Sequence, residues 1–575
     1  MANKSNRTVI LGSVGLAALA LAGGGTIGVM SAKRRIAAAI AQVPGLKVGA
    51  WSVDPASMQV KIRDIKLKQQ GMTLSADALT IPLSFGNIWA MASAKAAGGT
   101  ASADNIAITT PAFTLNIPHV TANDASFDDA ALAKMLDAKD PTPASQRIAG
   151  LTAGSISVPV LTLSQKLPTG TSVTTVHDIA MSDVVHGIIA HATIGKTAAV
   201  INANPAVQGT EAIDSMSLDQ LSLPVYLHWM VDTRKDDHEP RQLAVAGEKF
   251  TGISLHLTQK TAKGDVTTDI TVKDGDAQNL FMRAMSVPVV KFASTMPQPK
   301  PGQPLDAAAA QRIFAMEADL FGSTSFDHIV ANDIAVTVTG AAKDGAPAPK
   351  PINVSVDALT MGETTSPTAP PSGFNFGFAH VKTDLDQFPD SPGMTKFKTD
   401  FYSKLDLSLS NAMSWDLASG ALNLNDLTIS GVGVGSATVS LNLTNVGETL
   451  LSTKPADIEA AFLTAKATAL HVHLDNQGLV QKIMSVRAAA ASQTPEQFSQ
   501  QLIAGVGAMI PAVLGQSPAS QSISAALTKF LGDPKNIDIT ATSKDGIGAA
   551  EVMAAKVAGP AAIVSKLDIK ASANQ

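Results

Sequence analysis

The stretch Gln59–Gln69, QVKIRDIKLKQ, alternates apolar and charged residues as a strand with one buried side does. Val60 and Ile62 alternate with basic residues, but Asp64 then falls where the next apolar residue belongs. The apolar positions resume one residue late, at Ile65. A β-bulge shifts the phase of a strand in this way, because it adds one residue, and aspartate tolerates the dihedral angles that a bulge needs. The stretch therefore predicts a strand that bends at Asp64.

The same combination of an aspartate and a short apolar alternation recurs along the chain. Leu422–Ile429, LNLNDLTI, matches Val60–Leu67 position for position in residue type. Looser copies contain Asp77, Asp104, Asp178, Asp219, Asp333 and Asp357. We interpret each aspartate as the bend or the start of a strand, and their periodic return predicts a repetitive, stacked β architecture. A catalytic interpretation is disfavoured, because these carboxylates are spread through the chain without partners.

Other segments alternate without interruption and indicate antiparallel sheets with one covered face. Examples are KLDLSLS at 404–410, TVSLNLT at 438–444 and GISLHLT at 252–258. One side of each strand is apolar and the other carries Ser, Thr, Asn, Asp, His or Lys. The predicted fold is therefore mainly β with α insertions, built from elongated, curved antiparallel sheets that follow an N-terminal transmembrane helix.

The composition excludes several classes of protein. Of the 575 residues, 45% are hydrophobic and 16% charged, which is enough to bury a sizeable core. The formal net charge of −5 and the absence of a basic run argue against a nucleic-acid partner. The chain has no cysteine, so disulfides, thiolate metal sites and cysteine nucleophiles are excluded. Missing thiols also favour export to an oxidising compartment, with chance as the alternative.

The N-terminus predicts a membrane anchor within residues 1–31. Thr8–Met30 contains no charged residue, and as a helix it would extend about 35 Å, enough to cross a hydrocarbon core of about 30 Å. Both flanks of this segment are basic, so the charges do not decide its orientation. From the layout of a short tail, one apolar segment and a long remainder, we infer that the N-terminus lies on the inside. The alternative is a signal peptide cleaved after Ala20–Ala22. The favoured interpretation is a single-pass inner-membrane protein with its bulk in the periplasm.

Proline-rich and helical segments predict the domain organisation. Met296–Pro304, MPQPKPGQP, is expected to be a linker between two β-rich regions at 32–295 and 305–575. Asp306–Leu320 has a helical pattern with Asp306 as its cap, and Phe127–Asp137 is expected to be a short helix.

A helical insertion is predicted at 477–532, between strands at 469–474 and 537–542. Thr494–Gln497, TPEQ, is typical of a capping box with proline at the first helical position. Pro511 is expected to kink the helix that follows, and Ser517 starts another. We expect this insertion to cover one end of a sheet.

The search for chemistry predicts no catalytic, cofactor-binding or metal-binding residue, and the chain is not expected to be an enzyme. His471 and His473 share one side of a strand, with Asp475 as the nearest further ligand, and an exposed polar face is the favoured interpretation. His186 and His191 have a spacing that fits neither a strand nor a helix pair. Gly431–Ser436, GVGVGS, lacks the lysine of a phosphate loop and is expected to be a glycine-rich strand or bulge.

Several of these features together resemble a known group of proteins. The basic residues and alanine-rich segment after Met30, VPGLKVGAWSVDP at 43–55 and the strand QVKIRDIKLK resemble the start of AsmA-like and YdgA-like bacterial envelope proteins over about Ala32–Ile81. LHVHLDNQGLV and FLGDPKNIDIT, at 470–480 and 530–540, resemble a region of uncharacterised proteobacterial envelope proteins. The resemblance implies an inner-membrane anchor, a periplasmic β-rich body and a role in outer-membrane homeostasis and phospholipid traffic.

Two functional hypotheses follow. In the first, the chain binds or transports phospholipid on the apolar faces of its strands. In the second, it is a periplasmic scaffold that binds another envelope protein, or forms a homodimer, through edge strands or the helical insertion. The two differ in whether the apolar faces form an open groove or a closed core.

Overall fold

The computed structural model describes residues 45–575 except 55–56, 58, 70–71, 83–98, 111–112, 128–142, 168–169, 205, 237–238, 262–263, 290–306, 342–348, 365–371 and 452–454. The predicted anchor at 8–30, the linker at 296–304 and all but the first residue of the predicted helix at 127–137 lie outside these residues. No helix within the described part is long and apolar enough to cross a membrane.

The chain divides into two compact units. Unit 1 comprises Met1–Asp327 with Gly340–Ala348, and unit 2 comprises His328–Thr339 with Pro349–Gln575. Both are mainly antiparallel β with several helices, so the predicted fold class is confirmed at this level. The helix after the proline-rich stretch groups with unit 1, so the division between the units falls beyond the predicted linker.

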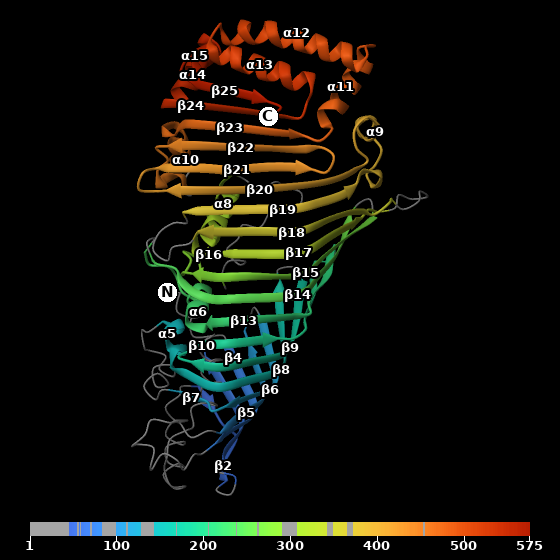
Figure 1. Ribbon diagram of the computed structural model, residues 1–575. Coiled ribbons are helices and arrows are strands. Elements are labelled where there is room, and N and C mark those ends of the chain that lie inside the picture. Colours follow the sequence, from blue (N-terminus) through green and yellow to red (C-terminus); the bar gives the residue numbers. More distant parts are fainter. Residues whose placement is uncertain are drawn as a thin grey trace. The chain divides into compact units, whose positions relative to one another are not determined.

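Unit 1 is an antiparallel sheet in which successive strands mostly pair with one another (Figure 1). β10 and β11 both pair with β9, and β12 and β13 both pair with β14. Helix α6 begins where the Ser222 side chain accepts a hydrogen bond from the Val225 N–H. The strands are β1 (Leu46–Lys47), β2 (Ala50–Asp54), β3 (Gln59–Gln69), β4 (Met72–Pro82), β5 (Thr100–Thr109), β6 (Phe113–Asn123), β7 (Ser126–Phe127), β8 (Leu151–Leu167), β9 (Gly170–Val185), β10 (Ile188–Ile194), β11 (Thr197–Asn204), β12 (Val207–Ile213), β13 (Ser215–Ser222), β14 (Gln242–Thr261), β15 (Gly264–Met282) and β16 (Thr324–Ser325). The helices are α5 (Ala144–Arg147), η1 (Ile148–Gly150), α6 (Leu223–Val231) and α8 (Ala307–Ser323).

Unit 2 is a meander in which each strand pairs with the next along the chain (Figure 1). Its strands are β17 (His328–Thr339), β18 (Ile352–Thr364), β19 (Gly373–Asp384), β20 (Lys404–Asp416), β21 (Ala421–Gly431), β22 (Gly435–Thr444), β23 (Lys466–Asn476), β24 (Asn536–Gly548) and β25 (Asp568–Ala573). Its helices are η2 (Leu385–Gln387), α9 (Pro392–Asp400), η3 (Glu448–Leu451), α10 (Pro455–Thr464), α11 (Leu479–Ala490), α12 (Pro495–Leu514), α13 (Pro518–Gly532), α14 (Ala549–Ala558) and α15 (Ala561–Val564).

The helical insertion of unit 2 is confirmed. Helices α11, α12 and α13 lie between β23 and β24, which pair with each other. The capping box is present at Thr494 and Gln497, and α12 continues through Pro511 to Leu514. Ala526 and Phe530 of α13 pack on Ile537 of β24, so the insertion covers the sheet at this end. Helices α10 and α14 were not predicted.

The apolar alternation of β3 does change phase at Asp64, but the predicted β-bulge, which would add one residue to this strand relative to its neighbour, is wrong. Arg63 pairs with Ala78 and Ile65 with Ala76, so β3 and β4 keep one register across the aspartate. The neighbouring strands shift phase at the same place: the buried residues are 62 and 65 in β3, 76 and 79 in β4, and 103 and 106 in β5. Because the three strands shift together, the register survives and the apolar side chains stay on one face.

Left-handed residues lie at this shift in β3 and β5. Asp64 has φ 55°, and Asn105 of β5, at φ 50°, donates its side-chain N–H to Asp77 over 2.9 Å. Gly49 lies beside Asp64, where a Cβ atom would come within 2.7 Å of the Asp64 Cβ, so a larger residue does not fit without movement. Aspartate and asparagine are among the few residues other than glycine that adopt this conformation at low cost.

Some of the other recurring aspartates also lie at or next to a left-handed residue. Asp178 and Asp333 are left-handed, whereas at Asp104 and Asp219 the next residue takes that conformation. Asp426 lies at a register shift between Leu424 and Leu427, so the predicted bulge is confirmed there. Asp357 instead forms an ion pair with Lys382. Six of the eight aspartates therefore lie at a left-handed residue or register shift or directly before one, whereas Asp77 and Asp357 do not.

Candidate functional site

The sheet of unit 2 has one continuous apolar face. Residues that pair directly across antiparallel strands share a face. One row of such residues crosses all nine strands of the unit and contains only apolar side chains: Ala331, Leu359, Phe378, Leu409, Ile429, Ala437, Leu474, Ile537 and Ala573. The predicted separation into an apolar side and a polar side therefore holds along this row.

This face is covered at one end and accessible in its middle. At the β23–β25 end, α13 packs on Leu474, Ile537 and Ala573. Further along, Phe378 is 37% exposed, Ile429 54% and Leu470 40%. We call the accessible part the apolar face of unit 2; none of its residues is buried, and they are Leu359, Met361, Phe374, Phe376, Phe378, Leu407, Leu409, Leu427, Ile429, Val439, Leu441 and Leu470.

Three phenylalanines of β19 form the aromatic part of this face. The rings of Phe374 and Phe376 have centroids 6.0 Å apart, and those of Phe376 and Phe378 are 6.4 Å apart. Their spacing follows from the two-residue period of a strand. At about 4.8 Å per strand spacing, the face extends about 24 Å from β18 to β23. That exceeds half of a bilayer's hydrocarbon core, about 15 Å, so an acyl chain can lie across several strands.

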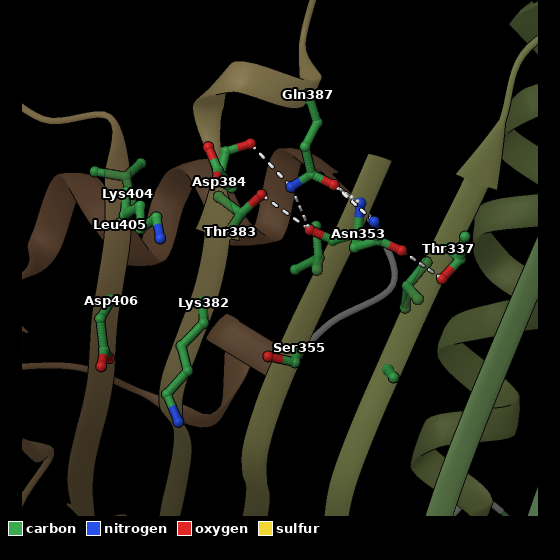
Figure 2. Close-up of a pocket in the computed structure, with 13 residues that line it drawn as sticks. Thr337, Asn353, Ser355, Lys382, Thr383, Asp384, Gln387, Lys404, Leu405 and Asp406 are labelled. Carbon is green, nitrogen blue, oxygen red and sulfur yellow. Dashed lines mark hydrogen bonds between the residues drawn. The ribbon is translucent and has the colours of Figure 1, made fainter. Parts of the chain in front are cut away.

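The polar side of the same sheet holds a pocket of about 480 Å³ at one end of β17–β20 (Figure 2). Gln387 lies above it and accepts hydrogen bonds from the N–H and side-chain amide of Asn353, both at 2.7 Å. Asn353 also accepts one from Thr337. The hydrogen bond to the Asp357 carboxylate raises the pKa of Lys382, and desolvation opposes this rise. These groups already bond to one another, so the pocket makes a weaker candidate than the apolar face.

The histidine pair proposed as part of a possible metal site lies on this polar side. His471 Nε2 is 2.7 Å and His473 Nδ1 3.2 Å from the same Asp538 oxygen, and His473 Nε2 is 3.0 Å from Asp475. Within the described residues, no three histidine, aspartate or glutamate side chains are grouped so that they could hold a metal ion. The favoured interpretation, a polar face, fits this ladder of hydrogen bonds.

The other motifs have structural positions. His191 pairs with Asp219 at 2.8 Å on adjacent strands, and His186 lies in the turn between β9 and β10 with φ 53°. The glycine-rich stretch is the hairpin turn between β21 and β22, with Gly433 at φ 68° and Gly435 at φ 121°. The prediction of a strand or bulge is therefore right only for its two ends.

A half-buried polar cluster in unit 1 contains the types of residue found in catalytic sites. His228 has Asp232 at 2.9 Å from Nδ1 and Glu239 on Nε2. The hydrogen bond to Asp232 raises the pKa of His228; burial opposes this rise and Glu239 adds to it. Ser145 donates to Asp232 and not to the imidazole. The hydroxyl is therefore not activated as a nucleophile, and the cluster holds α5 and α6 together.

Sequence reasoning did not single out the phenylalanines of β19 or any other residue as a binding site. The signal was present in GFNFGF at 373–378, where every second residue is aromatic. The periodicity of a sequence does not show whether such a face stays accessible, because the segments that could cover it are distant in the sequence.

Comparison with known proteins adds little. A family model described as "Uncharacterized protein" matches residues 428–574, from β21 to β25, which is less than half of the chain. No curated protein matches. The matched region contains the α11–α13 insertion and the end of the sheet that α13 covers, so the chain is similar to that family over this part of unit 2.

Proposed function

We propose that the chain is a non-enzymatic bacterial envelope protein that binds the acyl chain of a lipid on the apolar face of unit 2, anchored in the inner membrane by residues 8–30 with its bulk in the periplasm. The observation that carries the proposal is the exposure of Phe378 and Ile429, which lie in the uninterrupted apolar row, and of Leu470, which lies on the same face. Exposed apolar surface of this kind marks binding sites for apolar partners.

The chemistry of the face favours an acyl chain. Its residues carry no hydrogen-bonding side chain, and the backbone groups of β18–β22 are paired with strands on both sides. A partner therefore gains contact area here and no hydrogen bonds with the backbone. A hydrocarbon chain needs nothing else, whereas a protein surface needs partners for its polar rim.

The expected affinity for an acyl chain is low enough for the lipid to be released again. Each fully buried methylene contributes about 0.8 kcal/mol, and a chain lying on a face buries about half of its surface. About ten methylenes therefore contribute about 4 kcal/mol before ordering costs, which corresponds to binding near the millimolar range unless a second surface closes over the chain. Weak binding of this kind is compatible with handing a lipid on and supports a role in lipid transport for outer-membrane homeostasis.

The N-terminal resemblance to AsmA-like and YdgA-like envelope proteins supports the same proposal. It implies an inner-membrane anchor and traffic of phospholipid, and it does not depend on the apolar face, which lies far from it in the sequence. We also propose that the sheet is curved and repetitive, as the sequence pattern predicts.

Native mass spectrometry of the full chain, extracted gently from membranes, tests the function. The wild type is expected to carry phospholipid, and Ile429→Lys, which places a charge on the face, is expected to lose most of it. Ser430→Lys places the same charge on the opposite side of the same strand and should retain the lipid. Wild-type protein without lipid, or equal lipid on both variants, contradicts the proposal.

The alternative is a scaffold that binds another envelope protein. Helices α10 and α14 contact each other, and on them Phe462, Leu463, Met553 and Val557 are exposed. Exposed apolar residues on paired helices are typical of a docking surface. Cross-linking in membranes that captures one partner through α14, together with lipid-free protein, would favour this function over the first.

A further inference from the structure

One polar residue interrupts the apolar side of β20. The series Leu405, Leu407, Leu409, Asn411, Met413 alternates with polar residues and is apolar except at Asn411. Asn411 pairs with Phe376, as Leu409 does with Phe378, so its side chain is on the same side of the sheet as the apolar face of unit 2.

The carbonyl oxygen of this asparagine has no partner. Asn411 is 9% exposed, and its Oδ1 atom is buried and accepts no hydrogen bond. A buried acceptor without a donor destabilises the folded state, and nearly all such groups in proteins are paired with protein or water. An apolar residue of similar shape would fit the alternation and avoid the loss. The residue is therefore better explained by what it binds than by what it stabilises.

Among the described residues, its neighbours in the register and along the strand carry no donor side chain. The register places Phe376 opposite, and Leu409 and Met413 are its neighbours along the strand. A ligand on the apolar face thus meets the Asn411 acceptor among apolar side chains.

We propose, on the basis of the function proposed above, that Asn411 selects lipids whose acyl part carries a hydrogen-bond donor. The donor is a hydroxyl group on the chain or the N–H of an amide that links the chain to its head group. An unsubstituted, ester-linked chain has no such donor and leaves Oδ1 unpaired. The hydrogen bond forms only in the complex, so it adds affinity and contributes nothing to the free protein.

The test measures binding of defined probes to the full chain by equilibrium dialysis below their micellar concentrations. The hydroxyl arm compares 3-hydroxydecanoic acid with decanoic acid. The amide arm compares N-decanoylglycine with its ester analogue, O-decanoylglycolic acid. In at least one arm the wild type is expected to bind the donor probe about threefold to tenfold more tightly, as one buried hydrogen bond gives.

Asn411→Leu is expected to abolish this preference while binding decanoic acid as the wild type does, and Asn411→Ala is a second variant that cannot clash. Asn375→Leu makes the same change on the polar side of the neighbouring strand and should keep the preference. If no probe binds the wild type, the proposed function itself is overturned. If all probes bind without a preference in either arm, or the preference survives Asn411→Leu, this inference is overturned and the proposed function stands.

Discussion

Strands β3–β5 of unit 1 and β18–β22 of unit 2 share one sequence pattern and differ in what happens to their apolar sides. In the first region Val60 and Ile65 are 2% exposed and Leu74 is fully buried. In the second, Phe378 and Ile429 remain exposed, although they occupy equivalent places in the alternation. The alternation therefore determines which side of a strand is apolar, and the packing of other segments determines whether that side becomes a core or a surface.

The largest expected effect comes from truncating one leucine in each region. Leu74→Ala leaves a cavity in a filled core and should lower the free energy of unfolding by about 2–5 kcal/mol. Leu441→Ala removes a half-buried side chain and should cost about 1 kcal/mol. Hydrogen exchange of the β4 and β22 amides, measured by mass spectrometry, reports each unit separately. Equal losses at the two sites would show that the apolar face of unit 2 is as filled as the first core.

A smaller effect is expected to be the same in both units, because it depends on local backbone strain. Asp64 and Asp333 have φ 55° and 50°. Asp64→Val and Asp333→Val place a β-branched residue in the left-handed region and should each cost about 1–2 kcal/mol. The glycine variants should cost much less, since glycine adopts this conformation freely. Thermal unfolding of the four variants checks this, and a valine effect confined to β3 would tie the bend to the filled core instead.

Asn411 provides a third test, with the opposite sign. Replacing its buried, unpaired amide by leucine should raise the free energy of unfolding by about 1 kcal/mol, measured as a higher Tm. Asn375→Leu, on the exposed polar side, is the control and should leave the Tm almost unchanged. A lower Tm for Asn411→Leu would mean that the amide is satisfied in the folded protein and that its place in the apolar row is structural.

Much of this architecture could be predicted from the sequence, because it depends on local chemistry. Alternation located the strands, and Thr494 with Gln497 marked the start of α12. The phase shift at Asp64 was visible in the sequence of β3. That β4 and β5 shift phase at the same place was not visible, because this depends on how the strands are paired. Helix α14 has Gly548, which offers no hydroxyl, as its N-cap and was missed for that reason. Asn411 was visible as one polar residue in an apolar series, but its lack of a partner depends on neighbours from other strands.

The smallest expected effect is electrostatic and concerns the polar side of the same sheet in unit 2. Asp475 raises the pKa of His473; burial opposes this, and Asp538 adds to the rise. Burial tends to raise the pKa of Asp538, but its hydrogen bonds with His471 and His473 outweigh this and lower it. The stabilisation from His473 is thus complete below its ordinary pKa of about 6.5 and is lost as the pH rises through the raised value. That from Asp538 is present above about 4 and is lost as the pH falls through the lowered value.

Asp538→Asn should therefore lower the pKa of His473 toward its ordinary value without removing the contribution of Asp475. NMR titration of the His473 ring measures this directly, with Asp568→Asn on β25 as a control that leaves it unchanged. The accompanying change in stability should be small, because both partners are partly exposed and solvent screens the pair. A His473 pKa that does not respond to Asp538→Asn would mean that the ladder is absent in solution. The polar side of unit 2 would then differ from the half-buried His228 cluster of unit 1 in geometry as well as in burial.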